Sequence, residues 1–213
     1  MPQVSIIAIG PSVSELERLQ ELIRFQTFQN YEFIGKVGST FPEIWNQAIQ
    51  RARGEILVLT DTHARPVNNR WLEELVASII DERTIVKGLE VTSSPLDPSS
   101  LAGYKQAFVD HPFDEHYHWA EDTELFCRLK EAGYRFVQLD YAPVIHLSKL
   151  GSKIYLKRAF RYGLYWSRLR HRYAEPVELT SVSTAFKRLV AALLNLLGMF
   201  IGSIIYRSER RSS

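Results

Sequence analysis

The sequence predicts an α/β fold in which a mostly parallel, mixed sheet is covered by helices on both faces and is followed by a C-terminal helical extension. Three short segments with the character of strands, two of them mainly apolar, alternate near the N-terminus with two segments whose apolar residues recur at helical spacing. A continuous apolar run is typical of a strand that is buried on both faces. Strands that alternate with helices favour parallel pairing. We therefore expect one body over residues 1–150 and a further segment over residues 151–213.

The first half of the body contains the clearest strands. We expect them at Val4–Ile9, Tyr31–Val37 and Glu55–Thr60. Ser14 and Glu17 have the spacing of a capping box, which predicts the start of the first helix. The second helix is expected after the Gly38-Ser39-Thr40 turn. It should end at Gly54, because glycine is common just past a helix C-terminus.

The second half of the body has shorter elements. A helix is expected around Trp71–Ile80 and a strand around Thr84–Val91. Glu121–Ala132 has strong helical periodicity and should be stopped by Gly133. Two short strands are then expected, at Tyr134–Leu139 and Pro143–His146.

The charge is divided unevenly along the chain. Residues 1–150 contain 14 Lys and Arg against 21 Asp and Glu, whereas residues 151–213 contain 12 against 3. This asymmetry predicts that the C-terminal segment faces an anionic partner: a phospholipid surface, a nucleic acid or a phosphorylated substrate. The single cysteine, Cys127, excludes an internal disulfide and favours a reducing compartment. The N-terminus lacks the basic start of a secretory signal and indicates a buried strand.

Asp61-Thr62-His63 follows the third expected strand directly. In open α/β sheets, ligands bind beyond the carboxyl ends of the strands. A carboxylate and an imidazole leaving that edge together suit a borderline divalent cation such as Mn²⁺. The alternative is an aspartate that holds a turn, with a solvated histidine beside it.

Two further positions have side chains that could take part in catalysis or metal binding. Glu121 and Asp122 begin a predicted helix, where acidic residues are common because of the helix dipole, yet the same placement suits a general base at the rim of the sheet. His146 ends the last predicted strand and could join Asp61 and His63 around one ion. The alternative for His146 is a structural role.

Taken in order, these motifs resemble the glycosyltransferases of family two, whose Rossmann-like fold is called GT-A. The resemblance covers roughly residues 3–150. GEILVLTDTHARPVNNRWLEELV is similar to the family's third strand, its Asp-x-Asp metal motif and the helix after it. FDEHYHWAEDTELFCRLKEAGYRFV resembles the segment with the Glu-Asp motif, and PVIHLS the strand end where many members have a metal-binding histidine. VGST, residues 37–40, resembles the family's Asp-Gly-Ser-Thr turn.

The resemblance implies a GT-A catalytic domain over residues 1–150. It implies an inverting, hexosyltransferase-type enzyme that moves a sugar from a nucleotide-diphosphate sugar to an acceptor hydroxyl in a single displacement. Asp122 would be the general base, with Glu121 beside it. A divalent metal, Mn²⁺ or Mg²⁺, would be held by Asp61, His63 and His146. The nucleotide-sugar site would include Gly10, Pro11, Ser39, Thr40, Asp61 and Arg161.

Some positions depart from the family pattern. Lys36 and Val37 stand where the family usually has acids, the first of which reads the nucleotide base. This departure motivates an alternative, a catalytically inactive nucleotide-sugar-binding subunit of a membrane glycosylation complex. The chain lacks the Gln-x-x-Arg-Trp motif of processive polysaccharide synthases. It also lacks the Gly-x-Gly-x-x-Gly expected after the first strand of a dehydrogenase.

Residues 153–172 have the period of an amphipathic helix with one aromatic and one basic face. Its basic face contains Lys157, Arg161, Arg168 and Arg172. In one interpretation the aromatic face packs on the catalytic body. In the other, the basic face lies near anionic headgroups of a membrane. Arg158 or Arg161 reaching the substrate diphosphate is a further alternative.

Leu189–Tyr206 is an uncharged stretch of 18 residues, just long enough to cross a bilayer or else to lie in its interface. Gly198 and Gly202 form a Gly-x-x-x-Gly pair, which can join helices into a homo-oligomer. We expect a protein at the cytoplasmic face of a membrane that acts on a saccharide or lipid-linked acceptor. It would serve polysaccharide or glycolipid biosynthesis and would not bind nucleic acid.

Overall fold

The computed structural model describes residues 1–38, 41–90, 100–118 and 120–146, together with residues 164–165, 167–173, 193, 196–197 and 199. For Phe41 and His146 only the backbone is described. The chain divides into two units, Met1–Ser148 and Lys149–Ser213.

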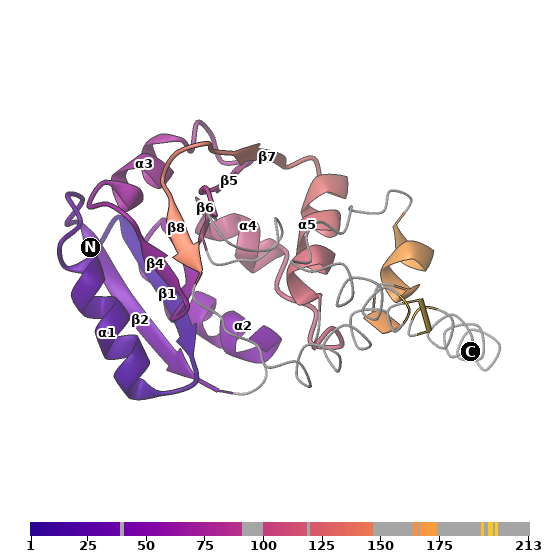
Figure 1. The fold of residues 1–213 in the computed structure, drawn as a ribbon. Helices are drawn as coiled ribbons and strands as arrows, with labels where there is room; N and C mark the ends of the chain where they lie inside the picture. The colour runs from indigo at the N-terminus through magenta and orange to yellow at the C-terminus, as the bar shows by residue number, and fades with distance from the viewer. Residues whose placement is uncertain are drawn as a thin grey trace. The chain divides into compact units, whose positions relative to one another are not determined.

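A six-stranded sheet with the order β2-β1-β3-β6-β5-β7 forms the centre of the first unit (Figure 1). Its strands are β1 (Val4–Gly10), β2 (Tyr31–Val37), β3 (Ile56–Asp61), β5 (Thr84–Lys87), β6 (Leu101–Tyr104) and β7 (Arg135–Gln138). β6 is antiparallel to both of its neighbours, and the other pairs are parallel. The predicted mostly parallel, mixed sheet is therefore confirmed.

Helices cover both faces of this sheet, and each face has its own apolar core. The helices are α1 (Val13–Ile23), α2 (Phe41–Arg51), α3 (Trp71–Ala77), α4 (Lys105–Asp110) and α5 (Glu121–Glu131). α1 and α3 pack on one face, where Trp71 is fully buried. α2, α4 and α5 pack on the other face, around Trp45. Residues of β1 and β3 alternate between the two cores, which explains their continuous apolar runs.

A second, two-stranded sheet consists of β4 (Ala64–Pro66) and β8 (Val144–His146) (Figure 1). The strands are antiparallel, and Ala64 is paired with His146. The buried side chains of Ala64 and Val144 belong to the core on the α1 face. This small sheet therefore attaches the end of the first unit to the segment that leaves β3.

Two helix boundaries differ from their predictions. The N-cap of α1 is Ser12 and not Ser14, because the Ser12 hydroxyl accepts a hydrogen bond from the Glu15 backbone N–H at 3.3 Å. α2 ends at Arg51, so Gly54 does not terminate it. Instead, Gly54 approaches β1 so closely that a Cβ atom there would lie 2.5 Å from the backbone nitrogen of Ser5.

Other elements are shorter than expected or were not expected. α3 ends at Ala77 and β5 ends at Lys87. β4, β6 and α4 were not predicted, because none of them exceeds 6 residues and none has a periodic apolar pattern. α5 begins at Glu121 and is followed by Gly133 at φ 84°, as predicted.

In the second unit, residues 164–165 and 167–172 are helical. Leu169 and Tyr173 are buried, whereas Arg170, His171 and Arg172 are exposed. The guanidinium of Arg168 lies 5.7 Å from the ring centre of Tyr165, which is a cation–π contact. Most of the predicted helix 153–172 and of the stretch 189–206 lies outside the described residues. Within the part that is described, no helix is long and apolar enough to cross a membrane.

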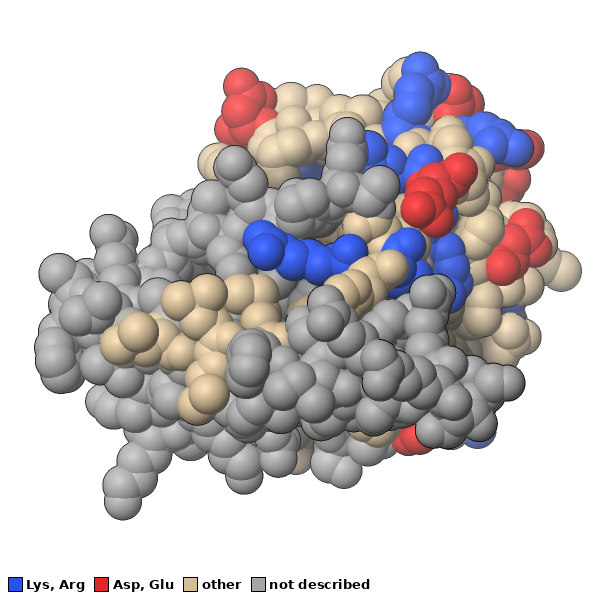
Figure 2. Space-filling view, turned by 90° about the vertical axis from the view of Figure 1, so that its right-hand side faces the viewer, with Lys and Arg blue, Asp and Glu red and all other residues tan. Residues whose placement is uncertain are grey.

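Basic and acidic side chains lie close to one another on the described part of the face shown in Figure 2. The first unit contains several ion pairs, for example Arg53 with Glu32 at 2.7 Å. The excess of basic residues is in the sequence of residues 151–213, most of which falls outside the description.

Candidate functional site

The carboxyl edge of the sheet near β1 is the place where the chain order of the strands reverses. β2 lies on one side of β1 and β3 on the other, and such a switch point opens a crevice for ligands. The strand registers place Lys36, Ile9 and Asp61 in one row across this edge. Gly10 and Val37 form the next paired position. Asp61 and the Lys36-Val37 pair therefore flank the end of β1.

Gly10 allows the segment after β3 to close over β1. A Cβ atom at Gly10 would lie 2.3 Å from Cγ2 of Thr62. The backbone N–H of Thr62 donates to the carbonyl of Ile9 at 3.0 Å, and its hydroxyl donates to Glu15 Oε2 at 3.1 Å. These bonds fix the segment to both β1 and α1. The structure thus gives Gly10 a packing role at the predicted nucleotide site, and Pro11 follows it as an exposed residue.

Asp61 organises the turn between β3 and β4. Its Oδ1 accepts hydrogen bonds from the backbone N–H groups of His63 at 2.6 Å and Ala64 at 2.9 Å. Aspartate commonly stabilises turns in this way. We refer to residues 61–64 as the Asp61 turn. The turn-forming role that the sequence left open is therefore present, and it leaves His63 exposed at the start of β4.

The backbone of His146 lies next to this turn. Its pairing with Ala64 brings the end of β8 to the residue that follows His63. The three residues predicted to bind a metal are therefore neighbours at the level of the backbone. No group of three His, Cys, Asp or Glu side chains that could hold a metal ion is found among the described residues, which do not include the His146 side chain.

The start of α5 places a second carboxylate at the same edge. β7 is parallel to β5, so β7 begins at the edge of the sheet where the parallel strands begin. α5 leads into β7 through Gly133, and α5 therefore starts at the opposite edge, where the parallel strands end (Figure 1). Asp122 is only 7% exposed, and its Oδ1 accepts bonds from the Thr123 backbone N–H at 2.7 Å and from the Thr123 hydroxyl at 3.3 Å. The positive end of the helix dipole also favours an ionised carboxylate at this position.

The residue before this helix has an uncommon conformation. Ala120 is fully buried and left-handed, with φ 63° and ψ 27°. An L-residue with a side chain in this region has a cost of roughly 1–2 kcal/mol. Such outliers persist where surrounding structure imposes them, often at functional sites. The sharp bend at Ala120 sets the direction in which Glu121 and Asp122 leave the preceding segment.

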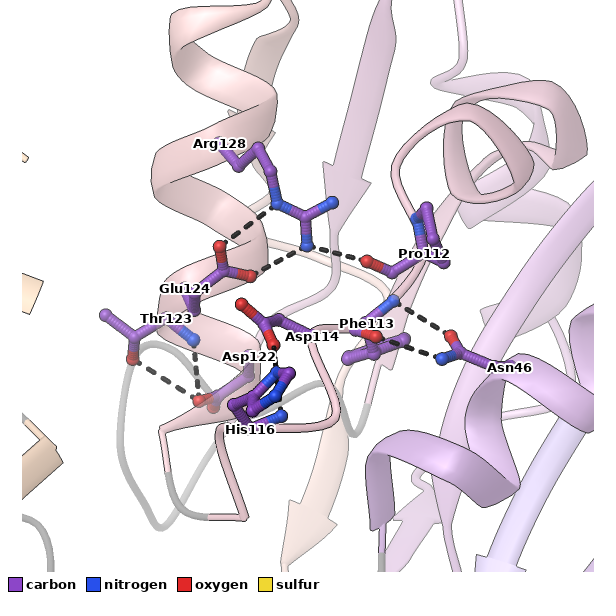
Figure 3. A network of polar contacts seen from close by, with 9 residues as sticks. All are labelled: Asn46, Pro112, Phe113, Asp114, His116, Asp122, Thr123, Glu124 and Arg128. Atoms are coloured by element: carbon purple, nitrogen blue, oxygen red, sulfur yellow. Dashed lines mark hydrogen bonds and ion pairs between the residues drawn. The ribbon is translucent and has the colours of Figure 1, made fainter. Parts of the chain in front are cut away.

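A polar network fixes that preceding segment (Figure 3). Arg128 donates two hydrogen bonds to the fully buried Glu124, at 3.0 and 2.7 Å, and a third to the carbonyl of Pro112 at 2.6 Å. Asn46 of α2 donates to the carbonyl of Phe113 at 2.9 Å and accepts from its N–H at 2.8 Å. The segment 112–116 is therefore held between α2 and α5, next to the start of the helix that carries Asp122.

This network was not identified from the sequence. Glu124 and Arg128 are four residues apart on a helix, and this spacing indicates an ion pair. Nothing in the sequence signals the bonds of Asn46, because its partner lies far along the chain. Ser39, Thr40, Arg158 and Arg161 lie outside the described residues, so their predicted roles stay predictions.

The lone cysteine offers no nucleophile at neutral pH. Burial, followed by the nearby carboxylates of Glu124 and Glu131, raises the pKa of Cys127 to about 11. The residue is therefore a neutral thiol under ordinary conditions. The candidate chemistry of this edge rests on carboxylates and imidazoles.

Comparisons with known proteins extend these observations at the level of fold. No family model and no curated protein matches the sequence. Among solved structures, the chain is similar to the mannosyltransferase PcManGT from Pyrobaculum calidifontis in complex with GDP-Man and Mn²⁺. The TM-score is 0.69 and the identity 14%, over 100% of this chain and 76% of that chain.

The chain is also similar to TarS 1-349 of S. aureus in complex with UDP-GlcNAc, with a TM-score of 0.54 and 14% identity over 91% of this chain and 71% of that chain. For the complex of TarS 1-349 with UDP, the TM-score is 0.52 and the identity 15%, over 91% and 70%. At these identities the likeness establishes the fold. The chain therefore has the Rossmann-like α/β fold of these glycosyltransferases, as its sequence predicts.

Proposed function

We propose that the protein is a glycosyltransferase that uses a nucleotide-diphosphate sugar, of the GT-A type and of family two. The observation that carries the proposal is the position of two aspartates at one edge of a fold shared with nucleotide-sugar glycosyltransferases. Asp61 follows β3 at the switch point, and the buried Asp122 begins α5 at the same edge. Substrates of such folds bind at this edge.

In this proposal Asp122 is the general base. The acceptor hydroxyl attacks the anomeric carbon, the bond from that carbon to the diphosphate oxygen breaks, and the hydroxyl proton passes to the Asp122 carboxylate. One displacement from the opposite side inverts the anomeric centre. A positioned base typically contributes 10²–10⁴-fold to the rate. The bonds that Thr123 donates to Oδ1 keep the carboxylate oriented, and Glu121 lies beside it.

The residues at the Asp61 turn fit a divalent cation in their chemistry. A carboxylate oxygen and imidazole nitrogens suit Mn²⁺, and Asp61, His63 and His146 would hold the ion. When bound, it would stabilise negative charge on the leaving diphosphate. The hydrogen bonds from His63 and Ala64 fix the Asp61 carboxylate at the end of β3, independently of any metal.

A second candidate is a nucleotide-sugar-binding subunit without activity. The row of Lys36, Ile9 and Asp61 favours this second candidate. Lys36 stands at the edge of the sheet where the family usually has an acid that recognises the nucleotide base. Loss of that acid affects recognition of the nucleotide. It leaves Asp122 and the Asp61 turn unchanged, and we therefore prefer the enzyme.

We also propose that the C-terminal unit attaches the protein to the cytoplasmic face of a membrane. Leu193, Leu196 and Leu197 are helical and between 49% and 58% exposed. Their spacing places them on one helical face, and an exposed apolar face beside basic residues suits a lipid interface. Replacing all three with serine in the full chain should shift it from membrane to soluble fractions. An unchanged distribution would contradict this attachment.

The function is tested with the purified full chain and a panel of GDP- and UDP-sugars, with and without Mn²⁺. A ligand that binds the folded state raises the Tm, by an amount that corresponds to about 2.7 kcal/mol at one hundred times its Kd. We expect a Mn²⁺-dependent rise for at least one donor, hydrolysis or transfer from it, and inversion of the anomeric signal by NMR. Binding without turnover would favour the inactive subunit, and no binding would contradict both candidates.

A further inference from the structure

A small hollow lies between α1 and the segment that joins β3 to β4. α1 and β4 themselves are in contact, and both are labelled in Figure 1. Its volume is about 270 Å³, and its polar lining consists of Glu15, Arg18, Thr62, His63 and Arg65. Pockets for complete small ligands start at roughly 300 Å³. The hollow is therefore near the lower end of the sizes of ligand pockets, and its volume suits one ionic group with a short attachment.

Two arginines give this hollow its positive charge. Arg18 and Arg65 are exposed, and neither forms a hydrogen bond or an ion pair with any residue in the part of the chain that the structure describes. Nearby arginines differ in this respect, since Arg24 is paired with Glu21 at 2.7 Å and Arg70 with Glu73 at 3.6 Å. Arginine presents planar pairs of N–H donors that match phosphate oxygens, so two uncommitted guanidinium groups at one hollow favour a phosphate.

The single carboxylate of the hollow already has a partner. Glu15 accepts the hydroxyl hydrogen of Thr62, which lies nearly buried at 8% exposure. The two guanidinium groups therefore exceed the acidic charge of the lining by one. His63 lines the hollow from the side of the Asp61 turn.

The hollow is bordered by apolar surface. Leu19 and Leu22 form its remaining wall, and Leu22 is 40% exposed. Phe25, just past the end of α1, is 75% exposed. A phosphate that carries an apolar substituent could therefore contact α1 while its oxygens face the arginines.

We propose that this hollow is a phosphate subsite, for a phosphate monoester that does not belong to the nucleotide-sugar donor. The phosphate is either part of a soluble acceptor or the headgroup of a lipid. Thr62 and His63 line the hollow and directly follow Asp61 in the chain. A molecule held in the hollow therefore lies beside the proposed donor site. That placement rests on the proposed function, whereas phosphate binding in the hollow does not.

The test is calorimetric titration of the full chain with inorganic phosphate and with methyl phosphate. Arg18→Gln and Arg65→Gln should each weaken binding roughly tenfold or more, since a hydrogen bond to a charged group contributes at least that factor. Arg51→Gln is the matched control, because Arg51 is an exposed arginine at the end of α2 and outside the hollow. Equal affinities in all variants, or no binding by the wild type, would overturn the subsite.

Two further experiments distinguish a lipid headgroup from a soluble phosphate ester, and the phosphate subsite from the proposed glycosyltransferase function. Vesicles of phosphatidylcholine with phosphatidic acid should bind the wild type and Arg51→Gln more tightly than Arg65→Gln if the phosphate is a headgroup. If only the soluble esters distinguish these variants, the phosphate belongs to a soluble acceptor. Saturating GDP or UDP with Mn²⁺ should leave phosphate binding intact, and full competition would show that the hollow is part of the donor site. A chain that binds phosphate but no nucleotide sugar would keep the subsite and end the proposed function.

Discussion

The Asp61 turn and the start of α5 present the same kind of side chain in two different settings. Asp61 is half-buried at the end of β3, and one of its oxygens accepts two backbone N–H groups that close a turn. Asp122 is nearly buried at the first turn of a helix, and the bonds to its Oδ1 come from the next residue. Asp61 fixes the conformation of the backbone around it, whereas Asp122 is itself held in place by its neighbour Thr123. Substitutions should therefore affect stability at Asp61 and turnover at Asp122.

Asp122→Asn should have the largest effect. The amide keeps the size of the side chain and its oxygen can still accept from Thr123, but it cannot take a proton. We expect turnover to fall by about 10²–10⁴-fold while the donor still raises the Tm. Steady-state kinetics and thermal shift measure the two quantities. Glu131→Gln is the control, because Glu131 is an exposed acid at the other end of the same helix. Near-normal turnover of Asp122→Asn would remove the base assignment.

Arg128→Ala tests how the α5 side is held. It leaves the fully buried Glu124 without the guanidinium and the carbonyl of Pro112 without its 2.6 Å donor. Removing one partner of such a pair should destabilise the first unit by about 3 kcal/mol, measured by denaturant unfolding. Arg128→Lys should recover only part of this, because lysine cannot make the paired contacts. A loss below about 1 kcal/mol would mean that the network does not fix segment 112–116.

Gly10→Ala tests the packing under the Asp61 turn. The added Cβ would meet Cγ2 of Thr62 at 2.3 Å, and an overpacked site typically costs about 1–3 kcal/mol. Thr62→Ala in the same chain removes Cγ2 and should restore part of the stability. If the double variant is no more stable than Gly10→Ala alone, then Thr62 is not what excludes a side chain at Gly10.

Asp61→Ala and Asp61→Asn separate the two roles of this residue. Alanine leaves the N–H groups of His63 and Ala64 without their acceptor and should lower the free energy of unfolding by about 1–2 kcal/mol. Asparagine keeps an acceptor oxygen and should recover most of that stability. Both variants should lose the Mn²⁺-dependent part of the Tm rise with donor. A full Mn²⁺ response in Asp61→Asn would show that the carboxylate charge is not needed for the metal.

The sequence was most informative where burial is two-sided and the pattern is local. β1 and β3 were predictable because their residues face two cores and form unbroken apolar runs. β6 was not, since its four residues include Gly103, where a Cβ would lie 2.6 Å from Ile85. The packing of Ile85 requires glycine at this position, and glycine has a low strand propensity. The sequence pattern therefore does not indicate a strand here.

The candidate site shows the same division. Asp61, His63 and Asp122 could be named as candidates from the sequence because each stands at a fixed place relative to a strand or helix. The capping box was placed two residues too late, because Ser12 and Ser14 are each followed three residues later by glutamate and only the structure selects Ser12. Two features could not be predicted, because each brings together distant parts of the chain. One is the pair of hydrogen bonds between Asn46 and Phe113, and the other is the meeting of Arg18 and Arg65 at one hollow.

The pairing of β4 with β8 has a consequence for how the protein is made. β4 is synthesised early, but its partner is the last strand of the first unit. A nascent chain emerging from the ribosome therefore exposes the edge of β4 until nearly the whole unit has been translated. Contacts between such distant segments form late because closing the intervening loop is costly in entropy. A product of premature termination before β8 would retain β1 to β3 and lack the strand that covers this edge.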